Sequence, residues 1–160
     1  MKHLIIAIVA SLLLITFQSL AESSNELLID AGYQDLQYKE KTIYFSGNVS
    51  VKQGKLLITA DELFVETNDD GTTSKLIAKG SPAKFQQTGA DNEQISSEAL
   101  EIIYLVEQQV LKLEGKAVFK QGGSEVISDS VEFDLQAQRV KASGDKEQGG
   151  RVTTRLKIKN

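Results

Sequence analysis

The stretch GNVSVKQGKLLITADELFV, residues 47–65, contains two runs in which apolar and polar residues alternate. Such alternation is typical of β-strands that bury one face. The runs flank Gln53-Gly54, and a glycine-containing turn between two alternating runs predicts a β-hairpin. The apolar positions of the second run change phase between Ile58 and Leu63, so we expect a bulge or bend near Asp61.

The same hairpin pattern recurs along the chain. Residues 80–86 (GSPAKFQ) and 115–121 (GKAVFKQ) resemble the first run, and residues 95–102 (ISSEALEI) and 126–133 (VISDSVEF) resemble the second. The glycines that open these units, counted from position 47 to 80, 115 and 144, are separated by 33, 35 and 29 residues. Repeats of this size indicate stacked supersecondary units, none of which can bury its apolar face alone.

The rest of the sequence extends this pattern to both ends. Residues 98–109 are rich in helix-forming Glu, Ala, Leu and Gln, but the repeat places a strand, a turn near Glu107-Gln108 and another strand there. Strands are also expected at both ends, where the alternating residues are Leu27, Ile29 and Ala31, then Val152, Thr154, Leu156 and Ile158. Many short antiparallel strands joined by turns predict an all-β sandwich, barrel or jelly roll.

Composition is that of a globular protein and excludes several kinds of chemistry. The chain has 160 residues, of which 41% are hydrophobic and 25% charged, so one domain is expected. It has no cysteine, which excludes disulfides, a thiol nucleophile and a zinc–thiolate site. Its single histidine, His3, lies in the N-terminal segment discussed next, so imidazole catalysis is lost if that segment is removed.

The N-terminus has the features of a secretory signal peptide. Lys2 precedes an apolar run at residues 4–17, and Ser19-Leu20-Ala21 places small residues where a signal peptidase reads them. A buried helix or an uncleaved anchor is the alternative, although the run is short for a membrane span. We expect a signal peptide at residues 1–21, cleavage between Ala21 and Glu22, and a single domain at residues 22–160.

The expected mature chain is negatively charged. Removing residues 1–21 takes away Lys2 and no acidic residue, which leaves 17 basic and 22 acidic residues and a net charge of −5. Such a chain is a poor partner for nucleic acid, which selects a basic surface, and for an anionic membrane surface. We expect no nucleic acid, no metal and no cofactor.

The order of these motifs resembles the OstA-like family of lipopolysaccharide-transport proteins. The resemblance rests on the pattern G-N-V-x-V-x-Q-G-x-x-x-I-x-A-D-x-L at residues 47–63, on GSPAKF at 80–85 and on RVTT at 151–154. It covers nearly all of the expected mature chain. Within the family, it points to the small periplasmic bridge components.

The resemblance implies a fold, a location and a set of partners. The implied fold is a V-shaped, twisted β-jelly roll, built from repeated antiparallel hairpins and open at both ends. The implied protein is periplasmic, is not an enzyme and shelters the acyl chains of lipid A in an apolar groove. Its implied partners are lipopolysaccharide, an inner-membrane-anchored relative of the same fold, an outer-membrane assembly protein, and further copies of itself joined head to tail.

The inward-facing apolar residues are the candidates for such a groove. Apolar side chains line a lipid groove and a packed core alike, so both interpretations stay open here. The candidate groove residues are Ile29, Leu36, Tyr38, Ile43, Phe45, Val51, Ile58, Leu63, Phe85, Ile95, Ile102, Leu111, Leu113, Phe119 and Phe133, with Val49, Leu56, Val65 and Val131 on the same face. The candidate partner edges are Leu27, Ile29 and Ala31 at one end, and Val152, Thr154, Leu156 and Ile158 at the other.

Two groups of acidic residues are candidates for catalysis or for metal binding. Asp61, Glu98 and Asp129 occupy equivalent positions, and two carboxylates could serve as the acid and base of a glycosidase. One carboxylate at each strand bend instead favours a side-chain hydrogen bond that satisfies the bent backbone. The segment Asp69-Asp70-Gly71 lacks the spaced oxygen ligands of a calcium loop and is interpreted as a solvated turn.

Three functional hypotheses follow from the sequence. The leading one is a periplasmic module that carries lipopolysaccharide from the inner to the outer membrane and assembles through its sheet edges. Opposite charges at the two edges, with Glu26 and Asp30 at one and Arg151 and Arg155 at the other, favour β-augmentation between copies. The alternative is a structural β-repeat adaptor that binds proteins by its edges without carrying lipid. An enzyme that acts on cell-wall sugars is the third.

Overall fold

Ten β-strands form one antiparallel sheet in the computed structural model, which describes residues 26–89, 92–145, 147 and 149–158. The expectation of an all-β fold is confirmed, because every regular element in these residues is a strand. Residues 94–105 form a strand followed by a turn, as the repeat predicted, rather than a helix. The expected signal peptide and its cleavage site lie outside the described residues.

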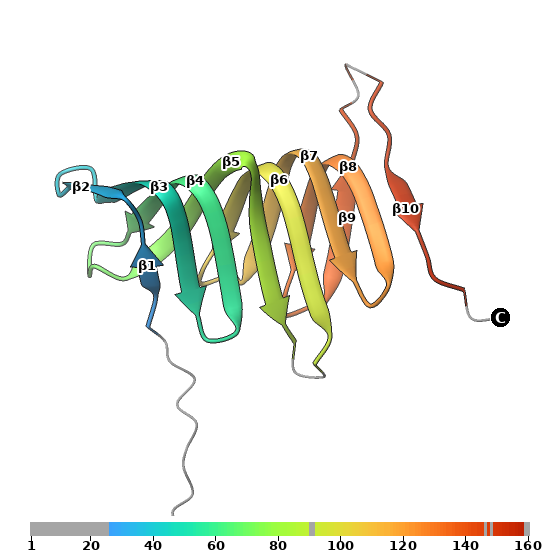
Figure 1. Cartoon of the computed structure of the whole chain (residues 1–160), viewed down its shortest axis with the longest axis horizontal. Helices are drawn as coiled ribbons and strands as arrows, with labels where there is room; N and C mark the ends of the chain where they lie inside the picture. The colour runs from blue at the N-terminus through green and yellow to red at the C-terminus, as the bar shows by residue number, and fades with distance from the viewer. Residues whose placement is uncertain (1–25, 90–91, 146, 148, 159–160) are drawn as a thin grey trace, which may run out of the picture.

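Six long strands form the body of the sheet, and two short strands lie at each end (Figure 1). The long strands are β3 (Thr42–Gln53), β4 (Leu56–Thr67), β5 (Thr73–Thr88), β6 (Gln94–Leu105), β7 (Val110–Gln121) and β8 (Ser124–Asp134). At one end β1 (Leu28–Asp30) and β2 (Tyr33–Gln37) both pair with β3, and at the other β9 (Arg139–Ser143) and β10 (Thr153–Arg155) both pair with β8.

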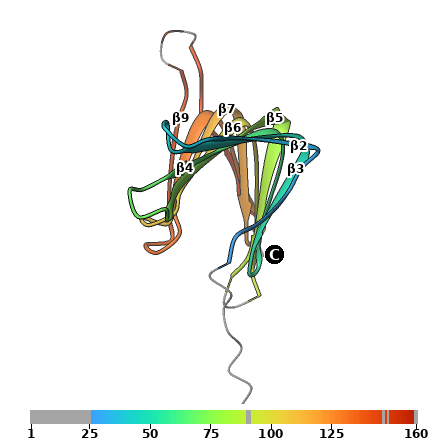
Figure 2. The same cartoon turned by 90° about the vertical axis from the view of Figure 1, so that its left-hand side faces the viewer.

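The long strands bend near the middle, which divides the sheet into two arms. Where β3 pairs with β4, Gly47 and Asn48 lie opposite Asp61 alone, and comparable register shifts interrupt the other pairings from β4 to β8. A bulge of this kind bends a strand and increases its twist. The bend expected near Asp61 is therefore confirmed. Figure 2 views the sheet along the direction in which the strands follow one another, and the two arms form a V in this view.

Glycine makes two of these bends possible. Gly47 has a φ of 84° and Gly115 a φ of 78°, a conformation that residues with side chains rarely adopt. A Cβ atom on Gly115 would also lie 3.0 Å from Cδ1 of Leu100 on the neighbouring β6. The residues that follow, Asn48 and Lys116, both have a φ of 52°. Two successive left-handed residues therefore mark each bulge.

Each arm is named after its first strand. The β1 arm comprises β1, residues 49–60, 83–89, 92–99 and 117–128, and β10. The β2 arm comprises β2, residues 42–46, 62–79, 101–114 and 130–134, and β9. Because consecutive strands run in opposite directions, the hairpin turns alternate between the free ends of the two arms.

Apolar rows on the inner faces of the arms form one core. In the β1 arm, the register aligns Ile29, Val51, Ile58, Phe85, Ser97, Phe119 and Val126; in the β2 arm it aligns Phe45, Leu63, Ala78, Ile102, Leu113, Val131 and Ala142. The rings of Phe119 and Phe133, which belong to opposite arms, have centroids 4.8 Å apart. The arms thus pack directly against each other near the bend and toward the C-terminal end.

Charges on the outer face alternate in sign from strand to strand. Acidic side chains on β4, β6 and β8 pair with lysines on the strands between them, as in Glu66–Lys75 at 2.7 Å and Lys79–Glu101 at 3.3 Å. Pairs exposed in this way contribute only about 0–1 kcal/mol each. Their main effect is on register, because a one-residue slip would move them onto the apolar face.

Some expected placements at the two ends are wrong. Tyr38 does not face inward: β2 ends at Gln37, and the Tyr38 side chain is 82% exposed in the turn that follows. Leu36 does lie opposite Ile43, but it is half-exposed because β2 has no further strand beside it. The last strand is also shorter than expected, since β10 omits Val152, Leu156 and Ile158, and Ala31 likewise falls outside β1.

The core should depend on its fully buried leucines. Leu113 is 0% exposed, so Leu113→Ala should reduce the free energy of unfolding by about 2–5 kcal/mol through lost burial and the cavity left behind. Leu28→Ala makes the same chemical change at a side chain that is 53% exposed, and it should cost less than about 1 kcal/mol. Urea unfolding of both variants measures the difference, and equal losses would contradict the assignment of the core.

Candidate functional site

A cavity of ≈ 790 Å³ lies between the free ends of the two arms, at the open side of the V. Leu56 and Gln87 line it from the β1 arm, and Tyr104, Val106 and Leu135 line it from the β2 arm. These residues come from the ends of β4, β5 and β6 and from the turns after β6 and β8. The volume falls in the range of pockets that bind small molecules, roughly 300–1,000 Å³.

The lining combines apolar walls with neutral polar groups. Leu27 and Leu56 supply apolar surface, and Thr72, Gln53 and Gln109 supply uncharged polar groups. Among the residues that the structure describes, Lys55 is the one charged residue in the lining, and none of these lining residues carries a carboxylate. In a chain with 22 acidic residues, this cavity suits an apolar ligand whose polar end is neutral or anionic.

Tyr104 places a hydroxyl group in the apolar wall. The side chain is 6% exposed, and burial raises the pKa of its phenol. A raised pKa keeps the hydroxyl protonated near neutral pH, so Tyr104 can donate a hydrogen bond there without adding negative charge.

A hydrogen bond joins the arms at the C-terminal side of the cavity. Nε2 of Gln121, at the free end of the β1 arm, donates to Oε1 of Gln138 at 3.1 Å and to Oε2 of Glu93 at 2.8 Å. Gln138 lies in the β8–β9 turn of the β2 arm. The equivalent residues one hairpin earlier, Gln87 and Gln109, both line the cavity instead. The arms are therefore tied together beside the cavity, which lies toward the N-terminal strands.

Most predicted groove residues lie in the core rather than in the cavity wall. The buried ones are Phe45, Val51, Ile58, Leu63, Phe85, Ile95, Ile102, Leu111, Leu113, Phe119 and Phe133, while Ile29 and Ile43 pack partly buried against them. Contact between these residues and a lipid stays a prediction. Of the other inward-facing residues, Leu56 lines the cavity, as does Leu27 from the predicted edge.

Several lining residues were missed by sequence reasoning. Tyr104 and Val106 stand in a continuous apolar run (IIYLV, residues 102–106), in which alternation assigns no face, and Leu135 lies just after β8 in the phase of Val131 and Phe133. One signal could have found part of the site. Gln53, Gln87 and Gln121 are spaced 34 residues apart, and each occupies the last inward-facing position of its strand. A polar residue repeated at an inward position indicates a wall that is not wholly apolar.

The carboxylates at the bends do not form an acid–base pair. Asp61, Glu98 and Asp129 are exposed, and none of them lines the cavity. Oδ2 of Asp129 accepts a hydrogen bond from the backbone N–H of Asp145 at 2.6 Å, whereas Glu98 lies 3.9 Å from Nζ of Lys84. Asp145 lies in the loop after β9, so this bond joins the bend to that loop. Among the described residues, none of the three carboxylates makes the expected hydrogen bond to the backbone of its own bend.

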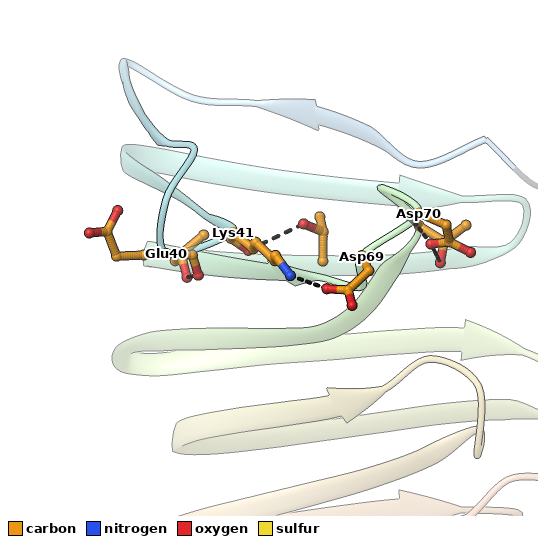
Figure 3. A network of polar contacts seen from close by, with 7 residues as sticks. Glu40, Lys41, Asp69 and Asp70 are labelled. Atoms are coloured by element: carbon orange, nitrogen blue, oxygen red, sulfur yellow. Dashed lines mark hydrogen bonds and ion pairs between the residues drawn. The ribbon is translucent and has the colours of Figure 1, made fainter.

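The acidic turn after β4 is held by ordinary turn contacts (Figure 3). Lys41 forms an ion pair with Asp69, which connects this turn to the turn before β3. Oδ1 of Asp70 accepts hydrogen bonds from the backbone N–H of Thr72 at 2.9 Å and from its hydroxyl at 2.6 Å, and these bonds lower the pKa of Asp70. No cluster of acidic side chains suited to a metal ion is present in the part of the chain that the structure describes.

Comparison with known proteins identifies the family. The family model described as "LptA/(LptD N-terminal domain) LPS transport protein" matches residues 28–139. The chain belongs to this family. The expected family is therefore confirmed, and it is a family of lipopolysaccharide transport proteins.

Relatives and a solved structure agree with this assignment. The chain is 29% identical to the lipopolysaccharide export system protein LptA of Escherichia coli K12 over 142 residues, which cover 88% of this chain and 75% of the relative. It is 24% identical to LptH of Pseudomonas aeruginosa over 135 residues, which cover 84% and 76%. The crystal structure of LptH, described as the LptA-homologous periplasmic component of the lipopolysaccharide transport device, has a TM-score of 0.77 at 20% identity, covering 85% of this chain and 98% of that one. The β-jelly-roll fold is thereby confirmed.

Substitution by aspartate should distinguish the cavity wall from the core. Ile58 is 1% exposed, so Ile58→Asp buries an unpaired charge and should unfold the protein. Val106 borders the open cavity, so Val106→Asp should leave the sheet folded, with a loss of less than about 2 kcal/mol. Far-UV circular dichroism and melting curves measure both effects. Unfolding of both variants would mean that the arms form a closed core with no accessible wall.

Proposed function

We propose that this chain is a periplasmic bridge component that binds lipopolysaccharide by its acyl chains and passes it from the inner toward the outer membrane. The observation that carries the proposal is the cavity between the arms of the V, in a chain of a lipopolysaccharide-transport family. The signal-peptide features at residues 1–21 support a periplasmic location.

Apolar contact supplies most of the affinity in this proposal. Each buried methylene group contributes about 0.8 kcal/mol, so a fully sheltered twelve-carbon acyl chain contributes on the order of 9 kcal/mol. The negative net charge gives no long-range attraction for an anionic headgroup. The acyl chain lies against Leu56, Val106 and Leu135, with the headgroup outside the mouth, near Lys55.

Deeper entry of the acyl chains requires the arms to separate. The predicted groove residues of the core, among them Ile58 and Phe119, then become lipid contacts in addition to core residues. Such separation is opposed by the contact of Phe119 with Phe133 and by the Gln121–Gln138 hydrogen bond. The cavity side of the V, which has neither of these ties, is the side from which an acyl chain enters.

The sheet edges supply the assembly part of the proposal. Strands β1 and β2 run in the same direction along one edge, and β9 and β10 run in the opposite direction along the other. A second copy placed against either edge, with its arms in line, therefore continues the antiparallel order of the sheet. Main-chain hydrogen bonds between unpaired edges are the basis of β-augmentation.

Charge supports the same head-to-tail order. The outer face alternates in sign by strand, and the series ends with basic β9 and β10, which carry Lys141 and Arg155. The first edge carries Asp30 on β1 and Asp35 on β2. These acidic residues continue the alternation of charge when the first edge of one copy lies beside the basic last edge of another. Further copies, an inner-membrane-anchored relative of the same fold and an outer-membrane assembly protein are the partners proposed for these edges.

A structural adaptor that binds proteins by its edges without carrying lipid is the alternative. It shares the edges with the leading proposal but gives the cavity no role. Lipid contact in the cavity therefore separates the two functions.

Photocrosslinking tests lipid contact directly. A photoreactive phenylalanine analogue in place of Tyr104 or Val106 should crosslink to purified lipopolysaccharide in a saturable manner. The same analogue in place of Phe64, on the outer face, is the matched control and should remain unlinked. Absence of crosslinks from the cavity, together with no saturable lipopolysaccharide binding by the intact protein, would favour the adaptor.

Light scattering tests the edges. The mature protein should form oligomers that grow with concentration and weaken with added salt, because screening reduces attraction between exposed charges. Deletion of residues 151–160 should leave the rest folded and should block growth at one end. Neutralising Arg139 and Arg151 to glutamine should weaken association at least threefold, whereas the same charge change at Lys84 and Lys112, within the sheet, should not. Equal masses for the intact and truncated proteins would contradict edge assembly.

A further inference from the structure

Two buried side-chain polar atoms in the described residues have no hydrogen-bond partner: Oε1 of Gln87 and Oγ of Ser97. A buried polar atom without a partner is destabilising, and most such atoms in folded proteins are satisfied. Both residues lie on the inner face of the β1 arm, on the adjacent strands β5 and β6. Because both unpartnered atoms lie on the same wall, we consider them together as one polar site.

The register places the two residues beside each other. Gln87 pairs with Ile95, and Ser97 pairs with Phe85, so Gln87 and Ser97 are diagonal neighbours on the same face. The Cα atoms of diagonal neighbours in a sheet lie roughly 7–8 Å apart. A glutamine side chain covers part of this distance, so the polar ends of the two side chains can lie closer together than their Cα atoms. Gln87 lines the cavity, whereas Ser97 is not among the lining residues and lies two residue pairs deeper toward the bend. We call Gln87 and Ser97 the polar notch.

Apolar neighbours explain why the notch has no partner within the chain. Gln87 stands between Leu56 and Ile95, which are 6% and 4% exposed. Ser97 stands between Phe85 and Phe119 in an otherwise apolar row and is 2% exposed. None of these four neighbours has a side-chain donor or acceptor, so no flanking side chain within the sheet can satisfy the notch.

The equivalent glutamines of the other repeats differ from Gln87. Gln121 donates to Gln138 and to Glu93. Gln53 lies on β3, where the short edge strand β1 reaches Lys52 but not Gln53. The orphaned oxygen is therefore specific to the middle repeat and is not a property of the repeated sequence.

We propose that the polar notch binds a hydroxyl group carried on the acyl chain of the ligand. This rests on the proposed function, since it concerns the same cavity. A hydroxyl both donates and accepts, so it can donate to Oε1 of Gln87 and exchange a hydrogen bond with the Ser97 hydroxyl. An unsubstituted chain leaves both atoms unsatisfied. The notch thereby makes the cavity selective for hydroxylated acyl chains over plain ones.

Calorimetric titration with simple amphiphiles tests the selectivity. The probes are tetradecanoate and its α-hydroxy, β-hydroxy and ω-hydroxy derivatives, whose carboxylate can lie near Lys55. The intact protein should bind at least one hydroxylated acid about threefold to tenfold more tightly than tetradecanoate, as one net hydrogen bond provides. The isomer that binds best reports the depth of the notch.

Three variants identify the groups responsible. Gln87→Leu and Ser97→Ala should each reduce the preference for the hydroxylated acid to less than about twofold. Both should unfold at the same or a higher urea concentration than the parent, since each removes a buried unsatisfied group. Gln53→Leu, the matched control at the equivalent repeat position, should keep the full preference.

The outcomes separate this inference from the proposed function. Equal binding of plain and hydroxylated acids by a protein that binds lipopolysaccharide would mean that an ordered water alone fills the notch, and it would overturn the selectivity only. Binding of lipopolysaccharide but of none of the acids would also count against the notch. A protein that binds neither lipopolysaccharide nor the acids would overturn the selectivity and the lipid carrier together.

Discussion

The bulge in the middle of the long strands is the constraint on which the rest of the structure depends. An unbent sheet of these strands would leave one long apolar face without cover, and two-layer packing is the usual solution for such a face. Here one sheet provides both layers, because a short left-handed step at Gly47 and at Gly115 turns the second half of a strand toward the first. The core, the cavity and the two split edges all follow from that bend.

The bend also explains why core and cavity coexist. Near the bend the arms are close, and residues such as Leu63 and Phe85 are fully covered. Farther out the arms diverge, and the chain covers the gap with turns and with polar residues. At the C-terminal side, Gln121 and Gln138 reach across the gap. One hairpin earlier the gap stays open as the cavity. Small differences between repeats therefore decide which part is core and which part is site.

Much of the fold could be predicted from the sequence, because the repeat gives strong local signals. Alternation gave the strands, the phase change at Asp61 gave the bend, and the repeat register overrode helix propensity after Glu98. The ends were harder to predict, since Tyr38 and Leu156 continue an apolar pattern after pairing has stopped. Whether a residue is paired depends on the strand beside it, and a strand at the end of the sheet has a neighbouring strand on one side only.

The candidate site was less predictable for a physical reason. Inward-facing residues of both arms look alike in sequence, yet only residues near the free ends, such as Tyr104 and Val106, border the cavity. Which of them do so depends on how far the arms separate, a distance set by the twist and bend of the whole sheet. The orphaned atoms of Gln87 and Ser97 are likewise visible only when every neighbour has been placed.

The short edge strands have a consequence for the motions of the molecule. β1 and β10 contain three residues each, against eleven to sixteen in the long strands, so few backbone hydrogen bonds hold them to their neighbours. In a stacked array, each unit is stabilised mainly by adjacent units, and the last unit has support on one side only. Local opening should therefore be easiest at the two ends and hardest around β5 and β6. A protein of this kind can exchange its terminal pairings repeatedly while its centre remains folded.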